Sequence, residues 1–187
     1  MKKTLIILIL LSIPILIHAF RSSYNTNYKI IKTVGSVEIR DYPKSLFASY
    51  YSRLSGDNSN FRVLANYIFG GNNRDEQIGM TSPVNMKISS KNNEMLFLMP
   101  SRYNETNIPK PNNNEIEIIS IEKRRVATVR FSGYANDEKV ENNKQILIET
   151  LKNHSIQHTN QFELLVYDSP YKLLNRRNEV LVVLQSE

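Results

Sequence analysis

Cysteine is absent from all 187 residues of this sequence. A chain without thiols has no thiolate nucleophile and no zinc–thiolate centre, and it cannot form a disulfide. The stability of its fold must therefore come from packing. The same absence excludes the lipid attachment that anchors bacterial lipoproteins, because that reaction modifies a cysteine.

Histidine is scarce, and its three examples are His18, His154 and His158. The last two are four residues apart, but they lie in the frayed end of a predicted helix and the turn after it. No further ligand is near them, so we interpret them as surface residues. The sequence also lacks G-x-S-x-G, H-E-x-x-H and a glycine-rich phosphate loop, and no convincing acid–base pair is evident. These absences predict a protein that is not an enzyme and has no metal site.

A concentrated basic patch is missing as well, although 24 Lys and Arg against 18 Asp and Glu give a formal net charge of +6. The longest basic clusters are Lys123–Arg125 and Arg176–Arg177. Nucleic-acid-binding proteins usually gather their cations on one surface. We therefore predict no nucleic-acid partner, and the mild positive balance favours an anionic small ligand.

One long apolar run is present, in the N-terminal segment MKKTLIILILLSIPILIHAF. Lys2 and Lys3 precede the run at 5–17, and Ala19 offers a small residue for cleavage. About 13 apolar residues suit a signal peptide and fall short of the ~20 that span a bilayer. We predict a cleavable secretory signal over 1–19, with an uncleaved N-terminal tether as the alternative.

Cleavage would leave a mature chain without a membrane span, located in the periplasm, in the secretory-pathway lumen or outside the cell. The polar stretch at 20–27 is predicted to be a flexible lead-in. Residues 28–187 are enough for one domain with its own core.

Two similar series of elements follow, at about 28–100 and 115–187, separated by a loop rich in proline and asparagine. Each series is predicted to be β-α-β-β, with alternating apolar residues in the strands and a three-to-four-residue apolar spacing in the helix. Two such halves indicate an α+β fold, a curved antiparallel sheet with a helix on each side and a ligand site in the concavity. The predicted strands are 37–42, 46–51, 83–88, 94–99, 116–122, 126–132, 162–168 and 179–185.

Helix boundaries can also be predicted from capping residues. Residues 57–59 offer an N-cap for the first helix, and Gly70-Gly71 end it. The second helix is predicted over 136–154, with Asn136 as its cap.

The stretch GSVEIRDYP, residues 35–43, places a carboxylate in an apolar row. Period-two alternation puts Val37, Ile39 and Asp41 on the buried face of a strand. A buried carboxylate without a partner is costly. Asp41 must therefore be paired, near the mouth of a cleft, or beside a ligand that needs it.

Several segments resemble the SOUL haem-binding proteins, in the right order from about residue 28 to 185. The most specific are IGMTSPV and SPYKLLNRRNEV, and SVEIRDYP, NYIFGGNN, FLMPSRY and RFSGYAND support them. The resemblance implies a distorted antiparallel β-barrel of two β-α-β-β repeats with two flanking helices, similar to the effector-binding domains of bacterial multidrug-response regulators. It also implies reversible binding of haem or another tetrapyrrole, without an enzyme reaction common to the family.

The resemblance carries ligand-binding roles to particular positions. The first-helix face formed by Phe61, Leu64, Ala65 and Ile68 corresponds to an apolar wall facing the haem, although a helix face that only packs in the core is an equal alternative. Lys172 matches a lysine close to the haem propionates, although it could be a solvated lysine. A second basic position of the family is Asn66 here, so that contact is missing.

Asp41 stands where some relatives have the histidine proposed to ligate the iron, in E-I-R-H-Y. The resemblance therefore implies a haem site without a histidine axial ligand. A structural alternative is that Asp41 or Glu38 pairs with Arg176 or Arg177 and joins the two halves.

Two hypotheses of function remain at this stage. The first is a non-enzymatic haem or tetrapyrrole binder with an apolar cleft. The alternative is a general module that sequesters hydrophobic or cationic small molecules, which carboxylates at a cleft mouth would suit.

Overall fold

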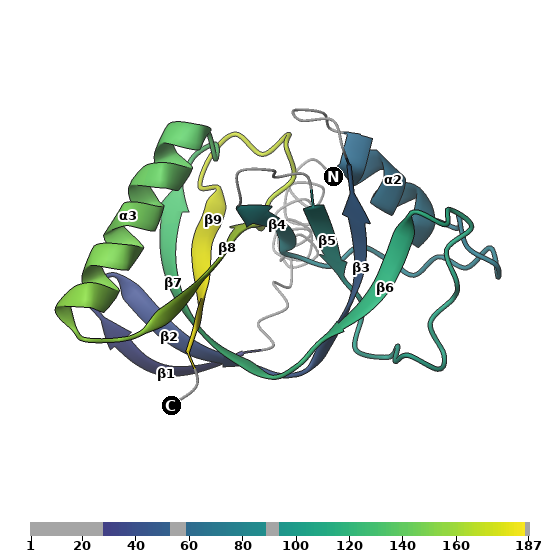
Figure 1. Ribbon diagram of the computed structural model, residues 1–187. Coiled ribbons are helices and arrows are strands. Elements are labelled where there is room, and N and C mark those ends of the chain that lie inside the picture. The colour runs from purple at the N-terminus through teal and green to yellow at the C-terminus, as the bar shows by residue number, and fades with distance from the viewer. Residues whose placement is uncertain (1–27, 53–58, 89–93, 186–187) are drawn as a thin grey trace, which may run out of the picture.

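The computed structural model of the chain describes residues 28–52, 59–88 and 94–185 (Figure 1). The predicted signal peptide at 1–19 and lead-in at 20–27 lie outside the described residues. So do the first two positions of the predicted cap at 57–59.

Two helices and nine strands make up the described part of the chain. The helices are α2 (Ser59–Ile68) and α3 (Asp137–Asn153). The strands are β1 (Lys29–Val34), β2 (Val37–Tyr42), β3 (Ser45–Tyr51), β4 (Val84–Ile88), β5 (Glu94–Leu98), β6 (Ile116–Ile121), β7 (Arg124–Ser132), β8 (His158–Val166) and β9 (Arg177–Leu184).

The strands form one curved antiparallel sheet in the order β1-β2-β7-β9-β8-β4-β5-β3-β6. The α+β class is thus confirmed, but the sheet is not closed into a barrel. Its two edges are β1 and β6, which do not pair with each other in the described residues. The curvature is plain in Figure 1, where β7 and β6 rise on opposite sides of the molecule.

The strand order is symmetric about the pairing of β8 with β4. One wing is β2-β7-β9-β8 with α3, and the other is β6-β3-β5-β4 with α2. Each wing therefore takes its outer strand from the other half of the sequence, because β2 comes before residue 100 and β6 after it. Strand β1 lies outside this symmetry and extends the first wing.

Both helices cover the same face of the sheet. Val84 is paired with Phe97 on one side and with Val166 on the other, so these side chains share a face. Phe97 belongs to the core under α2, and the same face continues along β9 to Val180 in the core under α3. The opposite face is the concave one, called here the inner face.

Most predicted elements agree with the structure within two residues at each end. Asn136 caps α3 as predicted, since its Oδ1 accepts a hydrogen bond from the backbone N of Lys139 at 2.9 Å. The strand predicted at 162–168 starts earlier in the structure, because β8 already begins at His158. Strand β1 was not predicted, since the exposed edge sequence KIIKTV has no clear alternation.

Candidate functional site

Asp41 forms a cross-strand ion pair. It lies on the face predicted from alternation, directly opposite Arg125 on β7. Its Oδ1 and Oδ2 accept hydrogen bonds from Nε at 2.8 Å and Nη2 at 3.0 Å of Arg125, which lower the pKa of Asp41. The structural alternative of a pair with Arg176 or Arg177 therefore named the wrong partner for Asp41. The pair still joins the two halves of the sequence.

The inner face of the same strand carries a buried arginine, which the alternation of apolar residues did not indicate. Arg40 is 2 % exposed and donates from Nη1 to Glu179 at 2.6 Å and from Nη2 at 3.1 Å. Glu179 also accepts from Arg177, at 3.0 and 2.7 Å, and from the hydroxyl of Tyr167 at 2.9 Å. Nε of Arg40 donates to Glu38 at 2.8 Å.

A second buried carboxylate, Glu163, lies on the inner face of the neighbouring strand β8. Its oxygens accept hydrogen bonds from Arg124 at 2.7 and 3.0 Å, from Lys87 at 2.8 Å and from Asn85 at 2.9 Å. Burial alone would raise the pKa of Glu163, but the bonds and charges of Arg124 and Lys87 lower it to about 2. The same balance, with Arg40 and Arg177 as the cations, lowers the pKa of Glu179.

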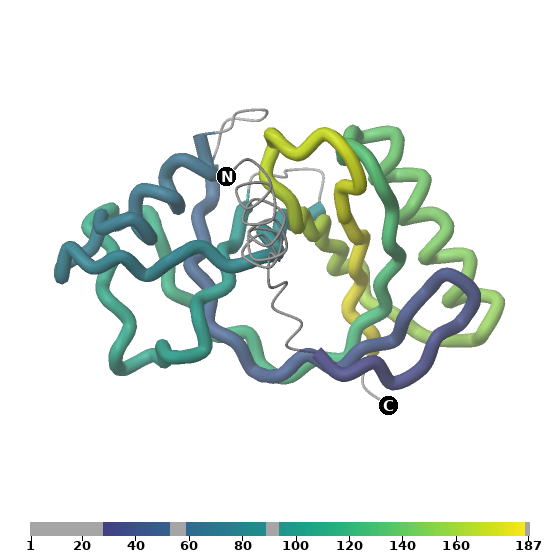
Figure 2. The backbone as a smooth tube through the Cα atoms, turned by 180° about the vertical axis from the view of Figure 1, so that it is seen from behind, coloured from purple at the N-terminus to yellow at the C-terminus, as the bar shows by residue number. Residues whose placement is uncertain are grey.

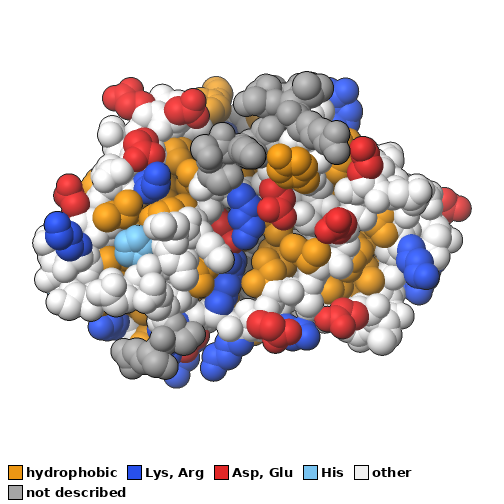
Figure 3. Space-filling model, viewed as in Figure 1, with side chains coloured by type: hydrophobic (Ala, Val, Ile, Leu, Met, Phe, Trp, Pro, Cys, Tyr) orange, Lys and Arg blue, Asp and Glu red, His pale blue; other side chains and the backbone are white. Residues whose placement is uncertain are grey.

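Both carboxylates are thus charged and neutralised from within the protein. Lys and Arg side chains gather along the middle of the face in Figure 3, beside a broad hydrophobic area. The signal in the sequence was a charged residue inside an apolar strand, as in FELLV for Glu163 and NEVLVV for Glu179. Alternation identified the α3 side of β2 as buried but did not indicate that the other side is covered too.

The predicted haem-facing residues of α2 divide into two groups. Leu64 and Ile68 are 0 % and 1 % exposed and pack in the core between α2 and the sheet. Phe61 is 39 % exposed, with its ring edge-on to Phe97 at 5.3 Å between centroids, and Ala65 is half-buried. Of this set, Phe61 has the surface that a ligand can contact without displacing the core.

Lys172 lies in the loop at 167–176 that connects β8 to β9. Its Nζ is 2.7 Å from Oδ1 of Asp168, and its side chain is 38 % exposed. This loop and the N-terminal end of α2 lie at the same edge of the molecule in both ribbon and tube views (Figures 1 and 2).

Asp41 is far from that edge. Ser132 of β7 pairs with Arg177 beside the loop, whereas Arg125 pairs with Asp41 at the other end of the strand. A strand rises about 3.3 Å per residue, so Asp41 lies roughly 20 Å from the loop of Lys172. The structure does not bring these two predicted site residues together.

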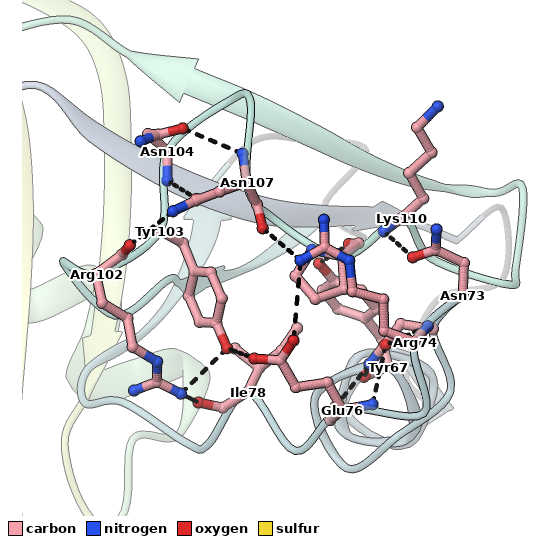
Figure 4. A network of polar contacts seen from close by, with 12 residues as sticks. Tyr67, Asn73, Arg74, Glu76, Ile78, Arg102, Tyr103, Asn104, Asn107 and Lys110 are labelled. Atoms are coloured by element: carbon pink, nitrogen blue, oxygen red, sulfur yellow. Dashed lines mark hydrogen bonds and ion pairs between the residues drawn. The ribbon is translucent and has the colours of Figure 1, made fainter.

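Two grooves flank the loop at 102–110, on the side of the α2 wing. The larger has a volume of about 510 Å³ and is lined by Lys44, Ser45, Leu46, Tyr103, Asn104, Glu105, Thr106 and Ser120. Hydrogen bonds hold this loop against the segment that follows α2 (Figure 4). Arg74 donates to the carbonyl of Asn107 at 3.0 Å, and Asn73 accepts from the backbone N of Lys110 at 2.8 Å. Neither groove is lined by Lys172 or by the α2 residues predicted to face haem.

Neither a metal centre nor a membrane span is found in the part of the chain that the structure describes. No three His, Cys, Asp or Glu side chains there are grouped so that they could hold a metal ion. None of the described helices is long and apolar enough to cross a bilayer.

The two-winged sheet with both helices on its convex face defines a class of α+β fold. It resembles the crystal structure of the EcmrR C-terminal domain, with a TM-score of 0.59 and 13 % identity over 86 % of this chain and 99 % of that one. A hydrolase from Listeria innocua gives a TM-score of 0.57 and 6 % identity over 83 % of this chain and 94 % of that one. At such low identity the likeness shows the fold alone.

The sequence model described as SOUL heme-binding protein matches residues 24–183, and the chain belongs to this family. Heme-binding protein 1 of Xenopus laevis is 31 % identical over 124 residues, which cover 63 % of this chain and 65 % of that protein. The match thus spans just under two thirds of that relative. Heme-binding protein 2 of Homo sapiens is 28 % identical over 168 residues, covering 82 % of this chain and 80 % of the relative.

Proposed function

We propose that this protein binds haem or another tetrapyrrole reversibly and does not convert it. The observation that carries the proposal is the family match over residues 24–183, together with relatives named for heme binding. The predicted secretory signal adds the proposal that binding takes place outside the cytoplasm. Haem would supply a flat apolar ring, an iron ion and two anionic propionates, and each can be compared with the residues present.

The edge formed by α2 and the loop at 167–176 fits the ring and the propionates. Phe61 is exposed there, and Lys172 places a cation on the loop. Leu64 and Ile68 would support this surface from beneath. Apolar contact plus one charge-assisted bond is enough for reversible binding of modest affinity.

The iron would have no histidine ligand in this site. Both oxygens of Asp41 are engaged by Arg125, and this residue lies at the other end of the sheet from Lys172. His154 caps the C-terminal end of α3, and His158 begins β8, near the end of β9 rather than beside the loop. We therefore infer a site that holds the ligand by its ring and propionates.

The alternative function has less support where it requires a cationic ligand. Glu163 and Glu179 are the buried carboxylates of the inner face, and each is already bonded to two cationic side chains. A cationic ligand would have to displace a buried arginine or lysine to reach either one. This favours an anionic or neutral ligand.

Titration of the purified protein with hemin tests the proposal. We expect a saturable shift of the Soret band, and Lys172→Gln should weaken the affinity about tenfold. A hydrogen bond to a charged group contributes roughly 1.5–3 kcal/mol, and about 1.4 kcal/mol corresponds to a factor of ten. Lys110→Gln, which removes an exposed lysine from another loop, is the matched control and should leave the affinity unchanged.

A linear, non-saturating change in absorbance would contradict haem binding. Equal affinity in the Lys172→Gln and Lys110→Gln proteins would contradict the placement of the propionates while leaving haem binding itself supported.

A further inference from the structure

The sequence contains two copies of the pattern Asn-x-Ser/Thr, which marks an acceptor of an N-linked glycan. They lie at 104–106 (NET) and at 153–155 (NHS). The pattern is short and the chain is rich in asparagine, so the letters do not distinguish an acceptor from a coincidence. Asn104 and Asn153 are both exposed, so a glycan could be accommodated at either one. The two copies differ in their local geometry.

At the first copy the asparagine and the hydroxyl are in contact. Oδ1 of Asn104 accepts hydrogen bonds from Oγ1 of Thr106 at 2.6 Å, from the backbone N of Thr106 at 2.9 Å and from that of Asn107 at 3.1 Å (Figure 4). A backbone N–H can only donate, so the side-chain atom that faces these groups is the amide oxygen. The amide nitrogen, Nδ2, is on the other side, and no hydrogen bond to another described residue engages it.

The turn that presents Asn104 is closed by its own residues. The carbonyl of Asn104 accepts from the backbone N of Ile108 at 3.1 Å, and its backbone N donates to Oδ1 of Asn107 at 2.6 Å. Nδ2 of Asn107 donates in turn to the carbonyl of Arg102 at 3.0 Å. All of these bonds lie within residues 102–108. The turn therefore does not depend on distant strands and can form on a growing chain before the sheet is complete.

The second copy has no such contact. Asn153 is the last residue of α3, and the backbone N of Ser155 donates back into the helix, to the carbonyl of Lys152 at 3.1 Å. Ser155 itself has a positive φ of 54°. In the part of the chain that the structure describes, no hydrogen bond joins the side chains of Asn153 and Ser155. The end of the helix thus leaves the amide and the hydroxyl unconnected.

The turn of Asn104 lies away from the edge proposed to bind haem. Glu105 is 3.5 Å from Nζ of Lys44, which follows β2. Tyr42, at the end of β2, pairs with Arg124, whereas the loop of Lys172 adjoins the opposite end of β7. A glycan at Asn104 would therefore leave that edge uncovered.

We propose that Asn104 is the acceptor of an N-linked glycan and that Asn153 is not. In this reaction Nδ2 of Asn104 forms a bond to the anomeric carbon of a lipid-linked oligosaccharide diphosphate. The bond from that carbon to the diphosphate oxygen breaks, and its electron pair leaves with the diphosphate. Nδ2 loses one proton to the transferring enzyme, and the hydrogen bonds at Oδ1 polarise the amide so that this proton is easier to remove. The proposal requires export into the secretory-pathway lumen, which the segment at 1–19 predicts, and does not depend on haem binding.

Cell-free translation of the full chain with microsomal membranes tests the proposal. The natural protein should give one band of lower mobility, which peptide N-glycosidase removes. Asn104→Gln and Thr106→Ala should each abolish this band, whereas Thr106→Ser, which keeps the hydroxyl, should retain it. Asn153→Gln is the matched control, because it removes the other exposed acceptor, and it should leave the band unchanged.

Protection from added protease shows whether the chain has entered the microsomes. A protected chain without the glycosylated band would overturn the proposal, and so would a band that persists in Asn104→Gln or is lost in Asn153→Gln. A chain that stays outside the microsomes would overturn it as well, because Asn104 would never meet the enzyme. None of these outcomes affects the hemin titration of the purified protein, so the two proposals can fail separately.

Discussion

Glu163 keeps its charge at a fully buried position because three neighbouring side chains solvate it in place of water. Arg124 and Lys87 supply the positive charge, and Asn85 adds a neutral donor. A buried ion pair costs much of its Coulomb energy in desolvation. Removing the carboxylate alone would nevertheless lower stability strongly, because the remaining cations would be left buried without a counter-charge.

We therefore expect a pH dependence of stability that can be assigned to this residue. The pKa of Glu163 in the fold is about 2, below its ordinary 4.5, so its contribution is complete above about 4.5 and is lost as the pH falls toward 2. The shift corresponds to a contribution on the order of 3 kcal/mol. In urea unfolding, Glu163→Gln should be less stable than the natural protein at pH 7, and the difference should shrink toward pH 2.

Glu117→Gln on the exposed side of β6 is the control, and its unfolding free energy should follow that of the natural protein at each pH. A difference between Glu163→Gln and the natural protein that stays constant from pH 7 to pH 3 would contradict the assignment.

At the scale of single elements, the segment after α2 depends on one buried asparagine. Asn72 is 0 % exposed, and its Nδ2 donates to the carbonyls of Tyr67 at 3.2 Å and Glu76 at 2.8 Å. Its Oδ1 accepts from the backbone N of Arg74 at 3.1 Å and of Glu76 at 3.2 Å. This side chain takes the place of a regular backbone ladder and fixes how α2 leads into the next loop.

Asn72→Asp keeps the shape but removes both donors and places a carboxylate against two carbonyl oxygens. We expect the free energy of unfolding to fall by about 2–4 kcal/mol, because two buried carbonyls lose their donor and face a carboxylate oxygen instead. Denaturant unfolding at pH 7 measures this change. Asn112→Asp, at an exposed position of the neighbouring loop, should cost under 0.5 kcal/mol as an ordinary surface change. Equal effects would show that Asn72 is not the central contact.

Elements with a strong period could be predicted from the sequence, and those without one could not. Strand β2 and the Asn136 cap of α3 follow directly from alternation and capping chemistry. Strand β1 was missed because an edge strand exposed on both faces has no apolar period. Side-chain pairs were harder to predict than helices and strands, since the pairing of Asp41 with Arg125 depends on which strands lie side by side. The exposure of Tyr171, Leu173 and Leu174 could not be predicted either, because apolar residues in a loop do not by themselves show whether they are covered.

At the scale of the whole molecule, each wing is completed by a strand from the other half of the sequence. Strand β2 forms the outer side of the α3 wing, and β6 forms that of the α2 wing. Charged contacts also join the two halves of the sequence, since Arg40 bonds Glu179 and Lys87 bonds Glu163. The duplication is therefore not two independent units side by side, and the halves must fold together.

This arrangement predicts that neither half folds alone. Fragment 115–187 would leave β7 without β2 as its neighbour and the buried Glu179 without Arg40. Fragment 24–114 would likewise lack β6 beside β3, and β8 beside β4. Each fragment should give weak, non-cooperative unfolding by circular dichroism. An equimolar mixture should regain one transition at the same denaturant concentration by circular dichroism and by tyrosine fluorescence, as expected for two-state folding. Cooperative unfolding of fragment 115–187 by itself would contradict this prediction, because the α3 wing would then be stable without β2 from the other half of the sequence.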